Sequence, residues 1–457
     1  MDNVVNEKNI FYKKLITLVV PIAFQNFMMA AVSASDALML GMINQDYLSS
    51  VSLASQVHFM LSLFLAALTI GGTILVAQYW GKRDIVVVEK VFAIIMKISF
   101  IISLGFFVVS TFDSNEIMKF FTTDDLLIEK GIKYLKIVGI SYLFTGISQV
   151  YLCIMKNCGD AIKSTVISSV SMILNIILNW IFIFGFRRIP SLGIAGAAIA
   201  TVIAKAVELT WVIIESLRKD KIKLRKEYIL SSDKILKEDF WKYTFPVLGN
   251  ELVWGLGFTM YSVIMGRLGS DAIAANSIAN IVKNLIACVC IGLGGASGII
   301  VGNELGQGYL DKAKRYGDSL FKLSIIGGVV SGITLICISP LILKYSNLNF
   351  TAIGYLKGML IMCSYYLIGK SINSTVIAGI FCAGGYSKFG FKCDTITMWG
   401  ITVPLGIIAA LYLKIPILGV YFIINLDEII KLPAVYYNYK KYNWVKDITK
   451  KYNNSYN

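Results

Sequence analysis

The stretch LITLVVPIAFQNFMMAAVSASDALML, residues 15–40, contains a single charged side chain, that of Asp36. About 20 apolar residues are enough for a helix to cross the hydrocarbon core of a bilayer. Runs of this kind recur along the 457 residues, of which 56% are hydrophobic and 16% are charged, with a mean hydropathy of +0.69. Soluble domains carry about 25% charged residues. The sequence therefore predicts an all-α polytopic membrane protein.

The apolar runs, separated by polar breaks, predict about twelve transmembrane helices. Lys8, Lys13 and Lys14 precede a first run that is too long to be the apolar core of a cleavable signal peptide, so this run is expected to remain as a helix. The spans are expected at 15–40, 49–79, 91–112, 132–155, 164–186, 193–217, 244–266, 278–303, 318–343, 356–383, 395–413 and 415–437.

Basic residues gather in alternate loops. Residues 81–83, 311–315, 218–242 and the tail from Tyr439 are rich in Lys and Arg, whereas the loop at 43–47 contains neither. Because cytoplasmic loops carry an excess of Lys and Arg, we expect a multi-pass protein of the plasma membrane with both termini in the cytoplasm. This topology explains the formal net charge of +15, so no nucleic-acid partner is expected.

The second half of the sequence repeats the first. Shifts of 225 or 226 residues superimpose many Gly and Pro positions, whose backbone roles are special. The pairs include Pro21 with Pro246, Gly41 with Gly266, Gly81 with Gly306, Gly159 with Gly385 and Pro190 with Pro416. Because six crossings return the chain to its starting side, the halves form a parallel repeat with a pseudo-two-fold axis along the membrane normal.

The repeat predicts four segments. Residues 1–217 form an N-lobe with spans 1–6, 218–242 a basic cytoplasmic linker, 243–438 a C-lobe with spans 7–12, and 439–457 a cytoplasmic tail. Two lobes around a central cleft favour transport by alternating access.

Several motifs are similar to those of a known family. The run P-(x)14-D-(x)4-G at 21–41 is followed by LSSVSLA at 48–54 and AQYWGKRD at 77–84; the second half contains ELVWGLG at 251–257, GRLGSDAIAANSIA at 266–279 and AGGYSKF at 383–389. Together they resemble the MATE (multidrug and toxic compound extrusion) transporters over nearly the whole chain. The resemblance implies a V-shaped pair of six-helix lobes that exports organic cations against inward Na⁺ or H⁺.

Asp36 is the first candidate for ion coupling. An acid at the centre of a membrane helix costs about 2.5–3.5 kcal/mol on insertion scales, so such acids usually face the protein interior or water. Counting from the helix ends puts Asn179 and Thr201 at a depth in the membrane similar to that of Asp36. Asn175 lies one turn away from Asn179 on the same helical face. The oxygens of this set could hold Na⁺, or Asp36 could bind a proton.

Other readings of these residues stay open. Asp36 could be solvated near the helix end, and the asparagines and threonine could serve interhelical hydrogen bonding. The resemblance places the N-lobe cation site on these spans. Some relatives have a second acid where Asn179 stands, and its absence weakens a proton scheme that needs two carboxylates.

Glu251 is the corresponding acid of the second half. Under the repeat it aligns with Asn26, ten helical residues or about 15 Å from the level of Asp36, so the two acids are not expected to share a site. The resemblance implies a role in cation coupling or substrate handling, and the alternative is an ion pair with a neighbouring Lys. Lys283, at the repeat position of His58, could partner Glu251 or face the cavity.

Aromatic and polar side chains are expected to contact the substrate. Aromatic faces near a carboxylate suit flat lipophilic cations through cation–π attraction. Gln25, which shares a helical face with Asp36, and Trp254 and Tyr261 are the candidates for lining the cavity. For most aromatic residues the alternative is packing or lipid contact. Asp394, at the start of the eleventh span, is expected at the membrane interface, although it could gate the inner side.

The leading hypothesis is a secondary antiporter that exports lipophilic organic cations, driven by Na⁺ or H⁺. The alternatives are a related flippase or exporter of lipid-linked saccharides, which should carry Arg and Lys in its spans for phosphates, and a non-transporting membrane sensor. No enzyme is expected, because the sequence lacks H-E-x-x-H, P-loop and nucleotide-binding motifs. No cofactor is expected, and no metal beyond Na⁺ at Asp36. The expected partners are organic cations and membrane lipid, with the chain acting as a monomer.

Overall fold

The computed structural model describes residues 2–218, 221–230, 233–346 and 348–453. These ranges are helical and contain no β-strand beyond one isolated bridge, between Phe186 and Ile189. The first helices are α1 (Asp2–Ile43), α2 (Gln45–Gly81), α3 (Ile85–Phe112), α4 (Ser114–Phe121), α5 (Asp125–Asn157), α6 (Ala161–Phe184), α7 (Ile194–Ser216) and α8 (Lys226–Leu230).

The second half contains α-helices and three π-helical stretches, η1 to η3. In chain order these are α9 (Lys234–Gly266), α10 (Ser270–Gly306), α11 (Leu310–Tyr345), α12 (Phe350–Asn373), η1 (Ser374–Phe381), α13 (Ser387–Asp394), η2 (Thr395–Thr402), α14 (Val403–Ile407), η3 (Ile408–Tyr412), α15 (Ile417–Ile424), α16 (Asp427–Ile430), α17 (Leu432–Lys440) and α18 (Lys450–Asn453).

Ten helical stretches in the described ranges are long and apolar enough to cross a membrane. They coincide with ten of the predicted spans. The other two predictions, 244–266 and 415–437, also fall on helices, in α9 and in α15–α17. The α9 span is more polar, because Glu251 interrupts its apolar run. The last span is divided into three short helices of 8, 4 and 9 residues. The all-α membrane fold is confirmed.

Contacts divide the chain into two compact units. Unit 1 comprises Met1–Phe27, Thr73–Asp84 and Glu238–Asn457, and unit 2 comprises Met28–Gly72 and Ile85–Lys237. This division differs from the predicted lobes in two segments, because the start of α1 and the end of α2 belong to unit 1 together with the second half of the chain.

Close packing explains why these two segments belong to unit 1. Gly292 on α10 lies against α1, where a Cβ added to it would come within 2.8 Å of the Ala23 Cβ. Near the end of α2, the Gln78 side-chain amide donates to the Ala383 carbonyl at 2.7 Å, and its Oε1 accepts from the Ile448 N–H at 3.0 Å. A small residue such as Gly292 lets the backbones of two helices approach each other. The buried Gln78 amide finds its hydrogen-bond partners within unit 1.

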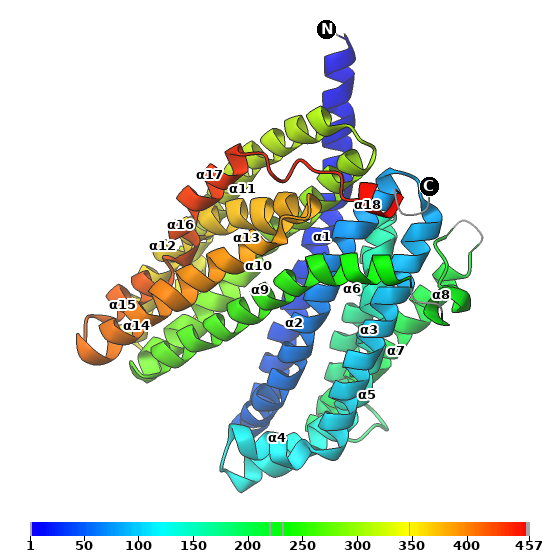
Figure 1. Cartoon of the computed structure of the whole chain (residues 1–457). Coiled ribbons are helices and arrows are strands. Elements are labelled where there is room, and N and C mark those ends of the chain that lie inside the picture. Colours follow the sequence, from blue (N-terminus) through cyan, green and yellow to red (C-terminus); the bar gives the residue numbers. More distant parts are fainter. Residues whose placement is uncertain (1, 219–220, 231–232, 347, 454–457) are drawn as a thin grey trace. The chain divides into compact units, whose positions relative to one another are not determined.

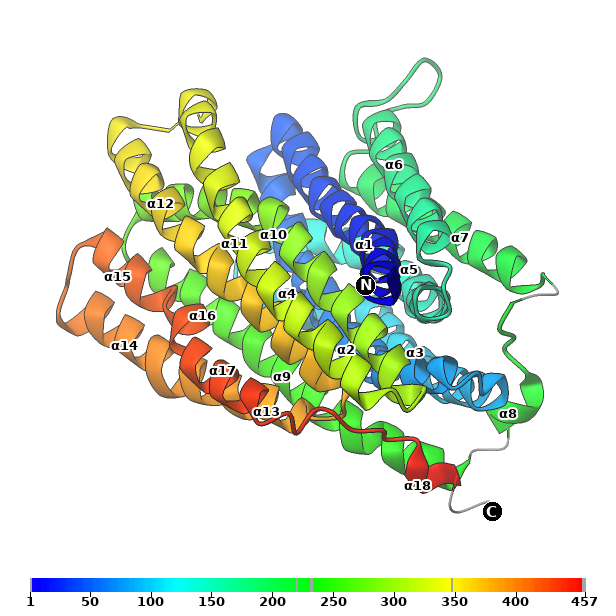
Figure 2. The same cartoon turned by 90° about the horizontal axis from the view of Figure 1, so that it is seen from above.

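In unit 1, helices α10, α11 and α12 run side by side (Figures 1 and 2). The chain after α17 packs back onto this layer through Trp444, which is fully buried. Its ring stacks on Tyr439 with centroids 5.7 Å apart, and a Cβ at Gly317 would touch the indole at 2.5 Å. This contact anchors the C-terminal segment to the core of the unit.

In unit 2, α5 lies beside α3 and α7, and α6 lies beside α7 (Figure 1). Helices α6 and α7 lie close together at Gly196, where a Cβ would lie 2.5 Å from the Phe182 carbonyl oxygen. Further along, Ser171 Oγ donates to the Ala204 carbonyl at 2.8 Å. These two contacts set the depth and rotation of α6 relative to α7, which together carry three of the four predicted coupling residues.

Acids of unit 2 hold the start of the basic segment 218–242. Arg225 Nε lies 2.6 Å from Glu89 Oε2, and Lys221 Nζ lies 2.5 Å from Asp160 Oδ2. The hydrogen bond to Glu89 raises the pKa of the Arg225 guanidinium. Part of the basic charge in this segment is therefore paired within the protein.

Candidate functional site

The four predicted coupling residues form one hydrogen-bonded group in unit 2. The side-chain amide of Asn179 on α6 donates to Asp36 Oδ1 on α1 at 2.5 Å and to Asn175 Oδ1 at 3.2 Å. The amide of Asn175 donates in turn to Thr201 Oγ1 on α7 at 3.3 Å. We call these four residues the coupling group. It joins three helices through oxygen-bearing side chains.

The coupling group is shielded and has an unused oxygen. Asn175 and Asn179 are 5% and 0% exposed, whereas Asp36 and Thr201 are half-buried. The Oδ1 of Asn179 is buried and finds no hydrogen-bond partner among the described residues. Because buried polar atoms are normally satisfied, an unmatched amide oxygen next to a carboxylate is suited to accept a cation or a water molecule.

Tyr134 on α5 is a neighbour of the coupling group that the sequence analysis missed. It packs against the cluster that contains Leu40, Ile183 and Ile194, and it interacts electrostatically with Asp36. A single tyrosine in an apolar span carries no sign of a nearby acid, so its position follows only from the tertiary structure.

A buried ion pair lies on the same face of α7 as Thr201. Lys205 Nζ is 3.1 Å from Glu208 Oε2, and the fully buried Glu208 also accepts from Ser148 Oγ on α5 at 2.7 Å. This pair is not among the predicted site residues. Two opposite charges spaced i,i+3 inside an apolar span were the signal that could have revealed it.

Glu251 and Lys283 do not pair with each other. In the described part of the chain neither has an oppositely charged group within 4.0 Å. Half-buried Glu251 interacts electrostatically with Lys370 and Asp394. Lys283 is 5% exposed, and its Nζ lies 4.5 Å from the centre of the Tyr366 ring. Of the two alternatives for Lys283, the structure therefore does not show the ion pair with Glu251, and the lysine is directed toward the Tyr366 ring.

The candidates for cavity lining lie in unit 1 with different degrees of burial. Half-buried Trp254 presents its ring to Lys370, whose Nζ is 5.1 Å from the ring centre. The hydroxyl of half-buried Tyr261 lies 2.5 Å from Thr402 Oγ1. Gln25 is only 4% exposed, so its side chain is packed inside the unit.

Asp394, which is predicted to lie at the membrane interface, is buried and ion-paired. It is 5% exposed, and its Oδ1 lies 2.8 Å from Lys431 Nζ. Lys431 also contacts Asp427 and Glu428. This network was not predictable from sequence, because Asp394 ends α13 and Lys431 lies between α16 and α17, and apolar periodicity does not reveal which of these segments meet.

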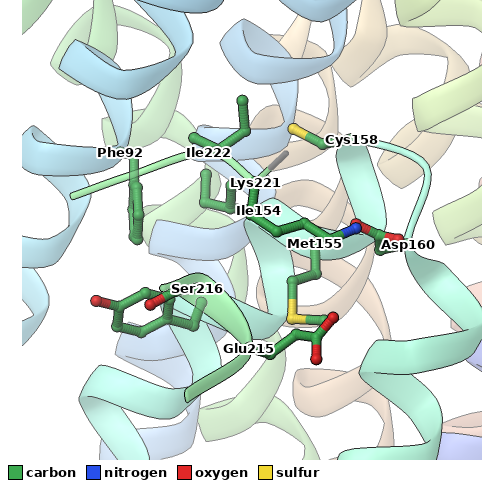
Figure 3. A pocket seen from close by; sticks show the side chains of 10 residues that line it. Phe92, Ile154, Met155, Cys158, Asp160, Glu215, Ser216, Lys221 and Ile222 are labelled. Atoms are coloured by element: carbon green, nitrogen blue, oxygen red, sulfur yellow. The ribbon is translucent and has the colours of Figure 1, made fainter. Parts of the chain in front are cut away.

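A small pocket in unit 2 lies near the C-terminal ends of α5 and α7 (Figure 3). Lys221 and Glu215 line it, and each belongs to an ion pair: Lys221 with Asp160, and Glu215 with Lys163 at 2.9 Å. Burial raises the pKa of the Cys158 thiol, which also lines the pocket. Its charged groups satisfy one another, so this pocket is not a candidate for ion coupling.

The described residues contain no group of three or more His, Cys, Asp or Glu that could hold a metal ion. All eight cysteines are free. The coupling group is chemically different, because a single carboxylate with amide and hydroxyl oxygens suits a monovalent cation better than a transition metal.

Comparison with known proteins gives a match in each half of the chain. The model of the family MatE matches residues 21–181 and 246–408. The uncharacterized transporter YisQ of Bacillus subtilis is 23% identical over 434 residues, which cover 94% of this chain and 95% of that protein. The probable multidrug resistance protein NorM of Thermotoga maritima is 24% identical over 426 residues, with coverage of 89% and 87%.

Solved structures share the fold. A transporter of the MOP superfamily from Pyrococcus furiosus has a TM-score of 0.86 at 16% identity, covering 94% of this chain and 95% of its own. A variant of the MATE transporter VcmN from Vibrio cholerae also has a TM-score of 0.86 at 16% identity, with coverage of 95% and 98%.

Proposed function

This chain belongs to the MATE family of membrane transporters, and from that premise we propose that it exports lipophilic organic cations by alternating access, coupled to inward movement of Na⁺ or H⁺. The multidrug resistance names of its NorM relatives support this class of cargo. Half-buried aromatic side chains in unit 1, among them Trp254 and Tyr261, are the groups that would contact flat cations.

The coupling group is the observation on which the proposal rests. It contains one acid, Asp36, whose bound partner is a neutral amide, so a cation that binds there neutralises the carboxylate. Na⁺ would take oxygens from Asp36, Thr201 and the asparagines, including the unpartnered Oδ1 of Asn179. A proton would bind the Asp36 carboxylate and leave the amides as hydrogen-bond partners.

Release of this cation changes the charge of the half-buried Asp36, inside unit 2, by one unit. A ligand shifts a conformational equilibrium only through its different affinity for the two states. The interaction of Asp36 with Asn179, and so with the helix that carries Asn179, differs between the anionic and the neutral form of Asp36. This difference is how cation binding would favour one state of the transporter over the other.

The proposal is tested with ethidium efflux from proteoliposomes that carry an imposed Na⁺ or proton gradient. Asp36→Asn keeps the shape of the side chain and removes its charge, so gradient-driven efflux should be lost. Asp46→Asn, in the first turn of α2, is the matched control and should retain efflux. Unchanged gradient-driven efflux in Asp36→Asn would refute the role of Asp36, and the gradient that drives the wild-type protein identifies the ion.

We further propose a location in the cell membrane with both termini in the cytoplasm. The density of Lys and Arg in 218–242 supports this orientation. Single cysteines introduced into 218–242 of a protein whose own cysteines are replaced should react with an impermeant thiol reagent only after the cells are opened. Labelling of intact cells would reverse the orientation.

Export of lipid-linked saccharides is the second candidate function, and one side chain favours it. Lys283 is buried without a carboxylate within 4.0 Å, so an anionic cargo could approach its ammonium group. The same proteoliposomes decide between the two candidates. Transport of a cationic dye that survives Lys283→Gln supports the drug exporter, whereas failure to move any cationic dye favours anionic cargo.

A further inference from the structure

Three lysines lie over tyrosine rings where α11 meets α17 in unit 1. On α11, Lys314 Nζ lies 3.9 Å from the centre of the Tyr442 ring. Next to the end of α17, Lys441 Nζ lies 4.2 Å from the centre of the Tyr437 ring, and a third lysine lies 5.7 Å from a third ring. Because Tyr442 directly follows Lys441, the three pairs form one continuous surface. We call these six residues the lysine–tyrosine surface: Lys314 with Tyr442, Lys441 with Tyr437, and Lys440 with Tyr436.

No acid of the protein neutralises these lysines. In the described part of the chain none of the three has a carboxylate within 4.0 Å. Asp318 stands four residues after Lys314 on α11, the spacing at which a helical acid and lysine usually pair. Asp318 instead accepts from the hydroxyl of Tyr439 at 2.8 Å and from that of Tyr442 at 3.4 Å. The tyrosines thus occupy the acid that would otherwise pair with Lys314.

The equivalent positions of unit 2 carry the opposite charge. Under the repeat, Glu89 aligns with Lys314, and Glu215 aligns with the lysines at the end of α17. The protein's own bases neutralise both acids, because Arg225 Nε lies 2.6 Å from Glu89 Oε2 and Lys163 Nζ lies 2.9 Å from Glu215 Oε1. The same place in the repeat is therefore neutralised by the chain itself in unit 2. In unit 1 the neutralising group would have to come from outside the chain.

The lysine–tyrosine surface borders an apolar surface of α11. Ile326, Val330 and Ile333 are each more than half exposed, on a helix that is long and apolar enough to cross a membrane. Ile326 lies about 18 Å along α11 from Lys314. Tyrosines with one apolar and one polar end gather at the level of lipid headgroups, and Tyr437 is exposed. Acyl chains against the apolar residues would bring phosphates close to the lysines.

We propose that the lysine–tyrosine surface binds the phosphodiester headgroup of an anionic membrane phospholipid. A lysine ammonium group donates to phosphate oxygens as a point charge, and the attraction between a cation and a ring face holds each ammonium in place. A zwitterionic phospholipid carries its own cation and gains less from these lysines. Binding needs no transport. Only its assignment to the cytoplasmic leaflet rests on the orientation proposed above.

Lysines that serve only to orient the chain in the membrane would behave differently. Their attraction for anionic lipid would depend on the number of positive charges and not on their positions. The proposal requires that the position matters, and that the rings matter even when every charge is kept. An acidic protein as the partner is disfavoured, because the lysines adjoin a surface that faces lipid.

The experiment uses native mass spectrometry of the purified full-length protein with equal amounts of phosphatidylglycerol and phosphatidylcholine. It measures how many molecules of each lipid stay bound. The test variant replaces the three lysines of the surface by glutamine. The matched control replaces three other exposed lysines by glutamine and removes the same total charge: Lys82, Lys226 and Lys237.

We expect the wild type to retain phosphatidylglycerol in preference to phosphatidylcholine. A lysine near an anionic membrane surface contributes about fivefold to association, so the preference should fall by about tenfold or more in the test variant. The control should keep it. Tyr442→Leu retains every charge but frees Asp318 to pair with Lys314, so it should lower the preference by about fivefold.

Three outcomes would overturn the proposal. The first is a wild type without preference for phosphatidylglycerol, which is the result expected if the surface receives an acidic protein. The second is an equal fall in the test variant and the control, and the third is an unchanged preference in Tyr442→Leu. If the test variant does not fold, the single substitution Lys441→Gln decides, with an expected fall of about fivefold. A failed efflux assay refutes the proposed export but does not alter these lipid measurements.

Discussion

Substitution of Gly196 by alanine should disturb ion coupling through the packing of two helices. A Cβ at this position would lie 2.5 Å from the Phe182 carbonyl oxygen, and also close to the Phe182 side chain at 3.0 Å. Ordinary contacts begin near 3.4 Å. The helices α6 and α7 must therefore separate by several tenths of an ångström, or by up to about 1 Å, because a backbone carbonyl in a helix cannot rotate away.

The size of the effect follows from this displacement. Overpacking in a protein interior costs about 1–3 kcal/mol, so the free energy of unfolding should fall by about that amount. The same shift acts on the hydrogen bond from Asn175 Nδ2 to Thr201 Oγ1, which is already 3.3 Å long. A further few tenths of an ångström moves it beyond hydrogen-bond range. The coupling group would lose its contact to α7, and cation-driven efflux should weaken.

Thermal denaturation of the purified protein measures the first effect, and ethidium efflux against cation concentration measures the second. Gly105→Ala is the matched control, because Gly105 is also helical but has no atom within 4 Å of an added Cβ. That variant should be as stable as the wild type or slightly more stable. The reasoning is refuted if Gly196→Ala matches Gly105→Ala in both stability and cation dependence.

Four further outcomes are expected. Asn179→Asp places a second carboxylate beside Asp36, and because two such groups share one proton, efflux driven by a proton gradient should increase relative to efflux driven by Na⁺. Trp444→Ala should lower the free energy of unfolding by about 3–5 kcal/mol, as measured by thermal denaturation, because a fully buried indole leaves a cavity. Glu89→Ala removes the acceptor for the Arg225 guanidinium and the Lys223 N–H, so chymotrypsin should cut faster at Tyr228. Burial raises the pKa of Cys158 above that of an exposed thiol, so less thiolate is present at a given pH; its alkylation rate should keep rising at pH values where an exposed thiol has levelled off.

Local pattern was enough to predict much of this protein. Apolar runs and their polar breaks predicted the helices, because a membrane span must satisfy its own backbone hydrogen bonds and present apolar side chains to lipid. The coupling group was also accessible from sequence. Asn175 and Asn179 share a face by helical spacing, and Thr201 lies on the next helix of the same hairpin at a matching distance from the turn. In both cases the geometry is fixed by distance along a helix.

Contacts between distant helices were not accessible in this way. Lys431 pairs with Asp394 on another helix, and Lys283 points to an aromatic ring instead of to Glu251. Helical spacing defines which residues share a face, but the rotation of each helix decides which neighbour that face meets. The last span is interrupted between α15 and α16, next to its charged residues, and the spacing of apolar residues in the sequence does not predict this break.

The grouping of helices likewise depends on tertiary structure. The repeat predicted two halves with a boundary in 218–242, because duplication leaves a record in sequence. The compact units instead take Met1–Phe27 and Thr73–Asp84 from the first half into unit 1. The physical reason is local packing, since Gly292 admits the backbone of α1 and the Gln78 amide finds its partners at Ala383 and Ile448. The sequence by itself determined where the helices lie and that an acid, Asp36, stands inside the first of them. The tertiary structure decided which charged side chains contact one another.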